Sequence, residues 1–487
     1  MIGVARTTWR DGAPEPLAMW EQVARDAAAD SGARRDPLAV VDDLGLVHCQ
    51  SWTYDDPTER LAERLRLGPG NRDVSILAGT APQRLVNAAA ERMLRGESRL
   101  ALVVGGEALA TRARLRCGGE APGWSFPHPQ PPDLPLDLDE WMLPTELAHG
   151  VLPAWLTFAL LDQARGAAHE TPAPEYRLEL GTLLARCSEV AAANPHAWFR
   201  SARTAAEITV PRSDNRMVAD PYTKLMTAFM DVDMAAGMLL ATHEEAERLG
   251  VPPDRRVYLR GWAFALDAKH LAARADLTRS AAMGVAARAA LDAAGVTVDD
   301  IAAFDLYSCF SAALGFAGDA LGIAPTDSRP VTVTGGLPYH GGPSANYMGH
   351  SIGHMVDQLR AEPGALGLLN GIGMHMTKHV WACYSTEPGP VRPPDYAALQ
   401  SEVDRRHSAR VVAAEATGPA RIASATAVYD HDSTPAWALA ICDLPDGQRA
   451  YARSDNPNVL DALAGDRWIE RTVELRAGTV GTNAIWL

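Results

Sequence analysis

A cysteine lies where an apolar strand should give way to a helix, in the segment Asp305-Leu306-Tyr307-Ser308-Cys309-Phe310. A helix dipole favours a thiolate near the helix N-terminus, so Cys309 could act as an acid, a base or a nucleophile. Tyr307 adds a second group that can exchange protons. A buried cysteine with a structural role is the alternative interpretation of the same pattern.

Glycines and prolines surround a histidine in segment 335–343, which reads Gly-Gly-Leu-Pro-Tyr-His-Gly-Gly-Pro. Glycine lets a backbone approach a ligand closely. We expect His340 to lie outside the core, between its glycines, and to titrate near neutral pH. Tyr339 and Gly342 complete this second group of candidate residues.

A third glycine loop precedes a predicted helix over 81–94. Thr80 and Gln83 have the T-x-x-Q spacing of a capping box. The start of such a helix offers free N–H groups beside Gly79, which could hold an oxyanion. An ordinary helix cap is the simpler interpretation.

A fourth loop, at 370–375, contains Asn370 and Gly373 after a predicted strand. Histidines near this loop suggest a metal site, but no acidic ligand stands at a useful spacing from them, so we expect no metal. These histidines are His350, His354, His375 and His379.

The elements that carry these loops occur twice along the chain. An Ala-rich helix precedes an apolar strand that ends at Asp42, and a similar pair precedes Asp305, at an offset of 263 residues (305 − 42). The same offset relates Gly79 to Gly342. The register predicts an internal duplication, with two unrelated helix–strand units as the alternative.

Strands alternate with Ala-rich helices in both halves, which is typical of a mostly parallel, covered sheet. The inserted segment between the halves opens with Pro127, Pro129, Pro131, Pro132 and Pro135. We predict a first half over 1–107 and 226–254, a helical loop domain over 108–225, a second half over 255–387, a linker over 388–404, and a small OB-like β-barrel with one helix over 405–487.

Composition excludes several function classes. The chain has 487 residues, 47% of them hydrophobic, and a net charge of −15, which disfavours nucleic acid as a partner because phosphate binding needs a basic face. Six cysteines without C-x-x-C spacing predict a reduced, cytoplasmic chain without a zinc framework. We find no signal-peptide pattern and no apolar run of the roughly 18 residues that a membrane span needs.

These four loops, in this order in a duplicated chain with a helical insert, resemble the thiolase superfamily over residues 1–387. Segment 305–310 is similar to the H-D-C-F loop of sterol-carrier-protein-linked thiolases, with Cys309 at the cysteine. Segment 335–343 is similar to their G-G…G-H-P loop, and segment 80–107 resembles the nucleophile helix and its following strand. The C-terminal segment is similar to the extra domain of thiolase-like proteins often named acetyl-CoA acetyltransferases. The resemblance implies the five-layer αβαβα thiolase fold.

The resemblance also implies that the chemistry has changed. A thiolase forms an acyl-enzyme on a cysteine at the position of Gly79, and glycine cannot be a nucleophile. The histidine and aspartate of H-D-C-F are Tyr307 and Ser308 here, and the histidine of G-H-P falls on Gly342. We therefore expect a CoA-thioester-binding protein, an acyltransferase by homology, that cannot carry out two-step thiolysis.

Three interpretations of function stay open at this stage. In a catalytic site, Cys309 would be the acid or base, assisted by His340, Tyr307 or Tyr339, and N–H groups near Gly79 and Gly373 would polarise a carbonyl. The second interpretation is a retro-aldolase acting on a β-hydroxyacyl-CoA, since thiolase-fold steroid side-chain aldolases are similar in carrying tyrosines here, such as Tyr307 with Tyr339 or Tyr347. Those aldolases work with a separate OB-containing partner. The third is a non-catalytic acyl-CoA or lipid carrier.

The resemblance implies CoA or an acyl-CoA as the ligand, with basic residues of the insert around its 3′-phosphate. Four arginines are available for that role: Arg200, Arg203, Arg212 and Arg216. Thiolases commonly form homodimers, although the added C-terminal domain leaves a monomer equally open.

Overall fold

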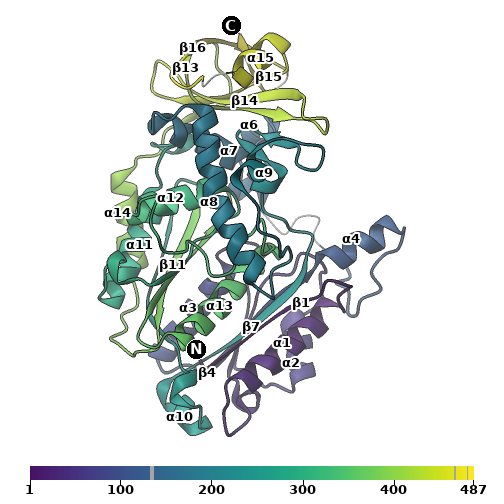
Figure 1. Ribbon diagram of the computed structural model, residues 1–487, viewed down its shortest axis with the longest axis vertical. Coiled ribbons are helices and arrows are strands. Elements are labelled where there is room, and N and C mark those ends of the chain that lie inside the picture. The colour runs from purple at the N-terminus through teal and green to yellow at the C-terminus, as the bar shows by residue number, and fades with distance from the viewer. Residues whose placement is uncertain (132–136, 466–467, 480, 487) are drawn as a thin grey trace.

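The computed structural model describes residues 1–131, 137–465, 468–479 and 481–486. Pro132 and Pro135 lie outside the described residues. Two sheets, a helical insert and a small barrel succeed one another along the long axis of the molecule, with the barrel at one end (Figure 1).

The first sheet has the strand order β1-β7-β4-β2-β3. Its strands are β1 (Gly3–Thr8), β2 (Asp43–Leu46), β3 (Asn71–Val74), β4 (Leu100–Ala108) and β7 (Asp233–Ala241). Every residue of β4 is buried, as expected of a continuous apolar run that is covered on both faces. The sheet is mixed, because β7 returns from the insert and runs antiparallel to both β1 and β4.

The second sheet has the order β8-β11-β10-β9, made by β8 (Tyr258–Leu266), β9 (Ala303–Asp305), β10 (Leu366–Gly373) and β11 (Lys378–Ser385). Only the β9–β10 pair is parallel. The expectation of mostly parallel sheets was therefore wrong, since hairpins and the returning strand dominate the pairing. Residues 334–337, which follow β3 of the first half by the offset of 263, form no strand here.

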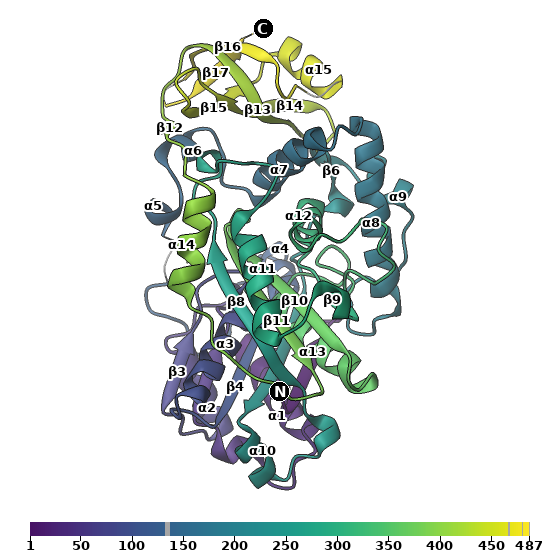
Figure 2. The ribbon, with the colours of Figure 1, turned by 90° about the vertical axis from the view of Figure 1, so that its left-hand side faces the viewer.

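Helices form three layers around the two sheets, which confirms the predicted five-layer αβαβα fold (Figure 2). The middle layer packs between the sheets and consists of α3 (Ala81–Leu94) and α13 (Tyr347–Ala361). The outer layers consist of α1 (Pro16–Asp30) and α2 (Pro57–Leu65) on the first sheet, and of α11 (Ala281–Ala294) and α12 (Ser311–Leu321) on the side of the second. α10 (His243–Leu249) follows β7.

A close helix–strand approach occurs in both halves and needs glycine each time. A Cβ atom on Gly3 would stand 2.0 Å from the carbonyl oxygen of Ala27, and one on Gly261 would stand 2.3 Å from that of Ala290. Ala290 follows Ala27 by the predicted offset of 263 residues. The same strand–helix packing in both halves agrees with an internal duplication.

The insert is largely helical. Its elements are α4 (Leu109–Cys117), α5 (Leu138–Trp141), α6 (Pro144–Ala148), α7 (Ala154–Ala168), α8 (Ala173–Ala193), α9 (Ala205–Thr209), β5 (Met217–Ala219) and β6 (Tyr222–Thr223). Helices α6 and α7 lie between the sheets and the barrel, whereas α4 projects beside the first sheet (Figure 1). Of these, α7 packs against the barrel strand β13 on one side and against α12 on another.

The C-terminal strands close into a barrel in the order β13-β14-β15-β17-β16, with β16 pairing back to β13. The predicted small OB-like barrel is thus present as a ring of five strands. Its elements are β12 (Val412–Ala413), β13 (Gly418–Tyr429), β14 (Pro435–Asp443), β15 (Arg449–Ser454), α15 (Pro457–Gly465), β16 (Thr472–Ala477) and β17 (Asn483–Trp486).

The segment expected as a linker, 388–404, is only partly a linker. From Tyr396 onward it forms α14 (Tyr396–Arg406), which packs on β8 and α11. Asp395 caps this helix through the N–H of Ala398, and Val403 is buried beneath it. The prolines that suggested a linker account only for the stretch before the helix.

No helix within the described residues is both long and apolar enough to cross a membrane.

Candidate functional site

The four glycine loops meet at one cavity of about 580 Å³. Gly79, Tyr307, Cys309, Gly342 and Gly373 all line it, so residues far apart in the sequence share one site. Aromatic and aliphatic side chains make most of the remaining wall: Leu77, Leu152, Trp155, Phe158, Met230, Phe310, Leu337, Ile372 and Met374. Polar side chains are few (Gln50, Thr227 and Ser344), and none of the described lining residues is a histidine or carries a charge.

The Tyr307 side chain fills the space that a side chain at residue 79 would need. A Cβ atom on Gly79 would lie 2.3 Å from the Tyr307 hydroxyl oxygen and 2.2 Å from the Ile372 carbonyl oxygen. Real Cβ atoms do not make such contacts, so the backbone here accepts only glycine while Tyr307 and Ile372 keep their positions. The absence of a side chain at residue 79 is therefore built into the packing of the site.

Tyr307 is held by its backbone and its ring. Its N–H donates to Asn370 Oδ1 at 2.6 Å, and its ring meets that of Tyr347 edge-on, with centroids 5.5 Å apart. Its hydroxyl makes no hydrogen bond within the described residues. Burial raises the pKa of Tyr307 well above its usual value, so the phenol stays protonated at neutral pH.

The fully buried carboxylate of Asp305 organises the loop that follows α12. It accepts hydrogen bonds from Thr332 Oγ1 (2.6 Å) and from the N–H groups of Val333 (3.0 Å) and Thr334 (3.2 Å). These bonds hold residues 332–334 beside the end of β9, where the Leu306 N–H also donates to the Val331 carbonyl at 2.9 Å. Sequence reasoning used Asp305 only as a repeat marker, and no motif indicated its role in holding this loop.

Cys309 lines the cavity, but its thiol is not activated. The residue is 9% exposed, and burial raises the pKa of its thiol well above the usual value. The expectation of a thiolate favoured by the helix dipole was wrong, because desolvation outweighs the backbone N–H groups at the start of α12. At neutral pH, Cys309 can donate a proton but is not poised to accept one.

His340 does not reach the cavity. It is 0% exposed, and burial lowers its pKa to about 4, so the predictions that it lies outside the core and titrates near neutral pH were wrong. The insert covers it: Trp198 N–H donates to the His340 carbonyl at 2.8 Å and Phe199 N–H to that of Tyr339 at 3.0 Å. Tyr339 is buried as well, and its hydroxyl donates to the Leu225 carbonyl at 3.2 Å.

His340 belongs to a buried histidine cluster that also includes His196, His350 and His354. Neighbouring ring centroids lie 5.1 to 5.6 Å apart, and both ring nitrogens of His350 lack a partner within the described residues. No group of three His, Cys, Asp or Glu residues within the described ranges could hold a metal ion. Burial keeps these imidazoles neutral, assisted by the positive charge of Arg6.

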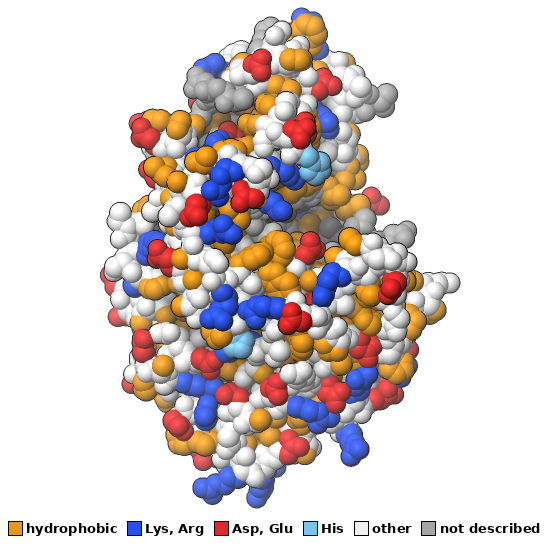
Figure 3. Space-filling view, turned by 45° about the vertical axis from the view of Figure 1, so that its right-hand side comes forward, with side chains coloured by type: hydrophobic (Ala, Val, Ile, Leu, Met, Phe, Trp, Pro, Cys, Tyr) orange, Lys and Arg blue, Asp and Glu red, His pale blue; other side chains and the backbone are white. Residues whose placement is uncertain are grey.

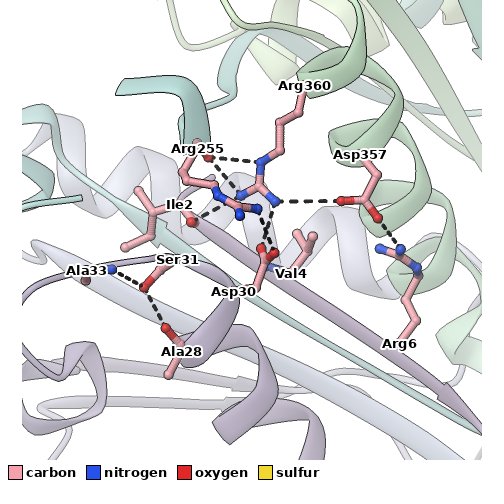
Figure 4. A network of polar contacts seen from close by, with 10 residues as sticks. All are labelled: Ile2, Val4, Arg6, Ala28, Asp30, Ser31, Ala33, Arg255, Asp357 and Arg360. Atoms are coloured by element: carbon pink, nitrogen blue, oxygen red, sulfur yellow. Dashed lines mark hydrogen bonds and ion pairs between the residues drawn. The ribbon is translucent and has the colours of Figure 1, made fainter. Parts of the chain in front are cut away.

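Ion pairs fix α13, which carries His350 and His354, to the first half of the chain (Figure 4). Arg360 on α13 pairs with Asp30 on α1 at 2.7 Å, and Asp357 pairs with Arg6 on β1. This network joins residues more than 300 positions apart and places the Arg6 charge beside the histidine cluster.

The predicted capping box at α3 is absent, although the helix itself spans the predicted residues 81–94. Thr80 has a helical backbone conformation and its side chain accepts no cap hydrogen bond. Gln83 is fully buried instead, where it accepts from the Tyr384 hydroxyl (2.8 Å) and donates to Asn87 Oδ1 (2.9 Å). Gln83 therefore bonds to Tyr384 and Asn87 instead of to the backbone at the start of α3.

The four arginines proposed for CoA do not line the cavity. The Arg212 guanidinium lies 3.5 Å from Asp214, and Arg216 donates to the carbonyl of Met217 at 2.9 Å. Arg200 is exposed and Arg203 is half-buried. Elsewhere on the acidic surface, Lys and Arg side chains flank a hydrophobic band across the middle of one face (Figure 3).

The rim of the cavity joins the two halves. Ser344 Oγ donates to Gln50 Oε1 at 2.9 Å, and Glu107 holds Gln50 and Ser51 by accepting their N–H groups at 2.7 and 2.8 Å. Arg112 donates to the Gln50 carbonyl from the other side. Glu107 is fully buried, and burial raises its pKa to about 7. No motif indicated this support for the rim.

No protein-family model matches the chain. The curated relatives include 3-ketoacyl-CoA thiolases of Yersinia pestis (strain Pestoides F) and Yersinia pseudotuberculosis (strain YPIII), each 30% identical over 152 residues. The match covers 28% of this chain and only a third (33%) of the length of these relatives.

A crystal structure of a monomeric SCP2-thiolase like protein type 1 from Mycobacterium smegmatis is similar over the whole chain. The identity is 30%, the TM-score is 0.87, and the match covers 100% of this chain and 98% of that one. The chain belongs to the SCP2-thiolase-like proteins of the thiolase superfamily. This membership confirms the predicted resemblance and includes the C-terminal barrel within the shared length.

Two further structures share the fold of this SCP2-thiolase-like chain. An acetyl-CoA acetyltransferase from Syntrophomonas wolfei is 14% identical with a TM-score of 0.55, covering 79% of this chain and 98% of that one. An Ltp2-ChsH2(DUF35) aldolase is 16% identical with a TM-score of 0.61, covering 78% and 96%. At these identities the similarity concerns the fold alone.

Proposed function

We propose that this SCP2-thiolase-like protein binds the acyl group of a CoA thioester in the cavity between its four glycine loops, without forming an acyl-enzyme. The observation that carries the proposal is the packing of Tyr307 against Gly79, which leaves no room for a nucleophile at that position. The apolar wall suits an uncharged acyl group, because burying apolar surface stabilises the complex by about 25 cal/mol per Å².

The lining also argues against proton abstraction at neutral pH. Thiolytic condensation needs a group that removes a proton from carbon, and His and carboxylate side chains usually do this. The described lining offers only Tyr307 and Cys309, both protonated at neutral pH. A site of this kind can still donate protons or hydrogen bonds to a thioester carbonyl.

Calorimetric titration with acetyl-CoA, longer acyl-CoA thioesters and free CoA tests the proposal. We expect an affinity that rises with acyl length, because the apolar wall contributes more binding free energy with each buried methylene. A spectrophotometric thiolysis assay with acetoacetyl-CoA should show no turnover. Binding of free CoA that equals binding of every acyl-CoA would contradict the proposal.

A second candidate function is a retro-aldol cleavage of a β-hydroxyacyl-CoA. One observation favours it: the Tyr307 hydroxyl reaches the cavity without a protein partner, where it could protonate the thioester enolate that forms when the Cα–Cβ bond breaks. The proton lost from the β-hydroxyl group would pass to water. Loss of this cleavage in Tyr307→Phe would support the lyase; an unchanged rate would exclude Tyr307 from it.

We also propose that the chain acts as a monomer, as the similar Mycobacterium smegmatis protein is described. Sedimentation velocity across a hundredfold concentration range should give a single species near 52.1 kDa. A concentration-dependent species of twice that mass would contradict the proposal.

A further inference from the structure

One wall of the cavity is a hairpin turn with an unfavourable backbone. Met374, which lines the cavity, has φ of 56°, and Met376 has φ of 57°. Residues other than glycine rarely adopt this left-handed conformation, because their Cβ atom crowds the backbone. The turn between β10 and β11 therefore needs support from its surroundings to keep its shape.

His375, between the two methionines, is held from two sides. Arg274 Nη2 donates to the His375 carbonyl at 2.6 Å and to Thr377 Oγ1 at 3.1 Å. Thr157 Oγ1 lies within hydrogen-bond distance of His375 Nδ1, at 2.9 Å. Arg274 is 5% exposed and forms no ion pair with a described carboxylate. Within the described residues, its side chain donates hydrogen bonds to this turn alone.

Both supports rest on the C-terminal barrel. On the Arg274 side, the Tyr451 hydroxyl of β15 accepts the Ala272 N–H at 3.1 Å, and the Arg449 guanidinium donates to the Arg274 carbonyl. Arg410 N–H, just before β12, donates to the Ala273 carbonyl at 2.8 Å. Barrel residues thus hold the backbone of 272–274 at three successive positions.

The second route runs through α7, which carries Thr157. On the barrel side of this helix, Ser424 Oγ of β13 donates to the Leu160 carbonyl at 2.6 Å. On its other side, Trp155 and Phe158 contribute to the cavity wall. The barrel therefore contacts α7, which carries Thr157, as well as segment 272–274, which carries Arg274.

From these contacts we infer that the C-terminal barrel is a support for the acyl cavity, and that Arg274 and Thr157 are positioning residues through which it fixes the turn at 373–377. The role rests on the proposed function only in that the cavity binds an acyl group. Side chains that contact the lining residues of a site, and not the ligand itself, commonly fix the geometry of that site.

Hydrogen–deuterium exchange on the full chain tests the inference without any ligand. We expect Arg274→Gln, Thr157→Val and Tyr451→Phe each to speed amide exchange in 373–377 by about tenfold, because the left-handed turn opens locally once a support is lost. Arg274→Lys, which keeps one donor for the His375 carbonyl, should give an intermediate rate. Arg476→Gln is the matched control, since this exposed barrel arginine stacks on Trp486 and its side chain makes no hydrogen bond to the residues that the structure describes.

Equal exchange in Arg274→Gln, Tyr451→Phe and the control would overturn the inference. If Arg274→Gln fails to fold, Tyr451→Phe decides, because it removes a single oxygen atom from the barrel. Acyl-CoA titration of the same variants should show an affinity lower by about fivefold, because a wall that is no longer fixed must be ordered when the ligand binds. Absence of binding in the unmodified protein would refute the proposed function. The exchange rates are measured without ligand, so they test the role of the barrel independently.

Discussion

The Tyr307 hydroxyl oxygen lies 2.3 Å from the point where a Cβ atom on Gly79 would stand. The two residues come from different halves of the chain. With Tyr307 in this position, residue 79 must be glycine, and a larger residue at 79 would displace the Tyr307 ring. A side chain at residue 79 and the Tyr307 ring therefore exclude each other, because the ring occupies the space that such a side chain would need.

Gly79→Ala should destabilise the protein by about 1–3 kcal/mol, because the added methyl group collides with Tyr307 and with the fixed Ile372 carbonyl. Urea denaturation measures the free energy of unfolding. The control is Gly284→Ala on α11, where a Cβ atom would meet nothing within 4 Å. That substitution should stabilise the helix by about 0.5–1 kcal/mol, and equal effects at the two sites would contradict the packing argument.

Tyr307 should remain protonated throughout the range in which exposed tyrosines titrate, because burial raises its pKa. Ultraviolet absorbance of the phenolate, followed from pH 8 to about 11, should therefore be the same in the unmodified protein and in Tyr307→Phe. A smaller absorbance change in the variant would show that the phenol ionises and could serve as a base.

Acid should destabilise the protein through its buried histidines. The pKa of His340 and that of His196 are lowered to about 4, so the unfolded chain binds more protons than the folded chain below pH ~6.5. The free energy of unfolding should fall as the pH drops from about 7 to 4, with up to about 3 kcal/mol from His340 alone.

Replacing one member of the histidine cluster should flatten this dependence. His350→Phe removes an imidazole whose two nitrogens lack described partners, so the variant should lose less stability between pH 7 and 5. His431→Gln, at an exposed position, should leave the slope unchanged. Thermal unfolding at several pH values measures both, and parallel curves for His350→Phe and the unmodified protein would contradict the prediction.

Glu107 should act in the opposite direction. Its pKa is raised to about 7, so between pH ~4.5 and 7 the folded chain binds more protons than the unfolded chain, and its contribution to stability declines as the pH rises. In Glu107→Gln the side chain no longer titrates, so this loss of stability with rising pH disappears. The amide group of the variant also places a donor opposite the N–H groups of Gln50 and Ser51. Relative to the unmodified protein, the variant should gain up to about 3 kcal/mol between pH 5 and 8, as measured by urea denaturation.

Local sequence patterns were sufficient for part of this structure. The helix over 81–94 was predicted at its observed bounds, and the alternating strands of the C-terminal segment predicted its barrel, because both signals depend on neighbouring residues. The family membership followed from the order of four glycine loops. Five candidate residues of those loops do line the cavity: Gly79, Tyr307, Cys309, Gly342 and Gly373. The apolar lining residues of the same loops, such as Leu337, Ile372 and Met374, were not singled out.

Tertiary contacts decided the chemistry of the site. Gln83 has the spacing of a helix cap but bonds to Tyr384, some 300 residues away. His340 stands between glycines yet is covered by the insert, and Cys309 lies just before a helix yet is part of an apolar wall. Residue type and spacing set which groups could react, whereas burial, which only the assembled chain determines, sets their protonation and reach.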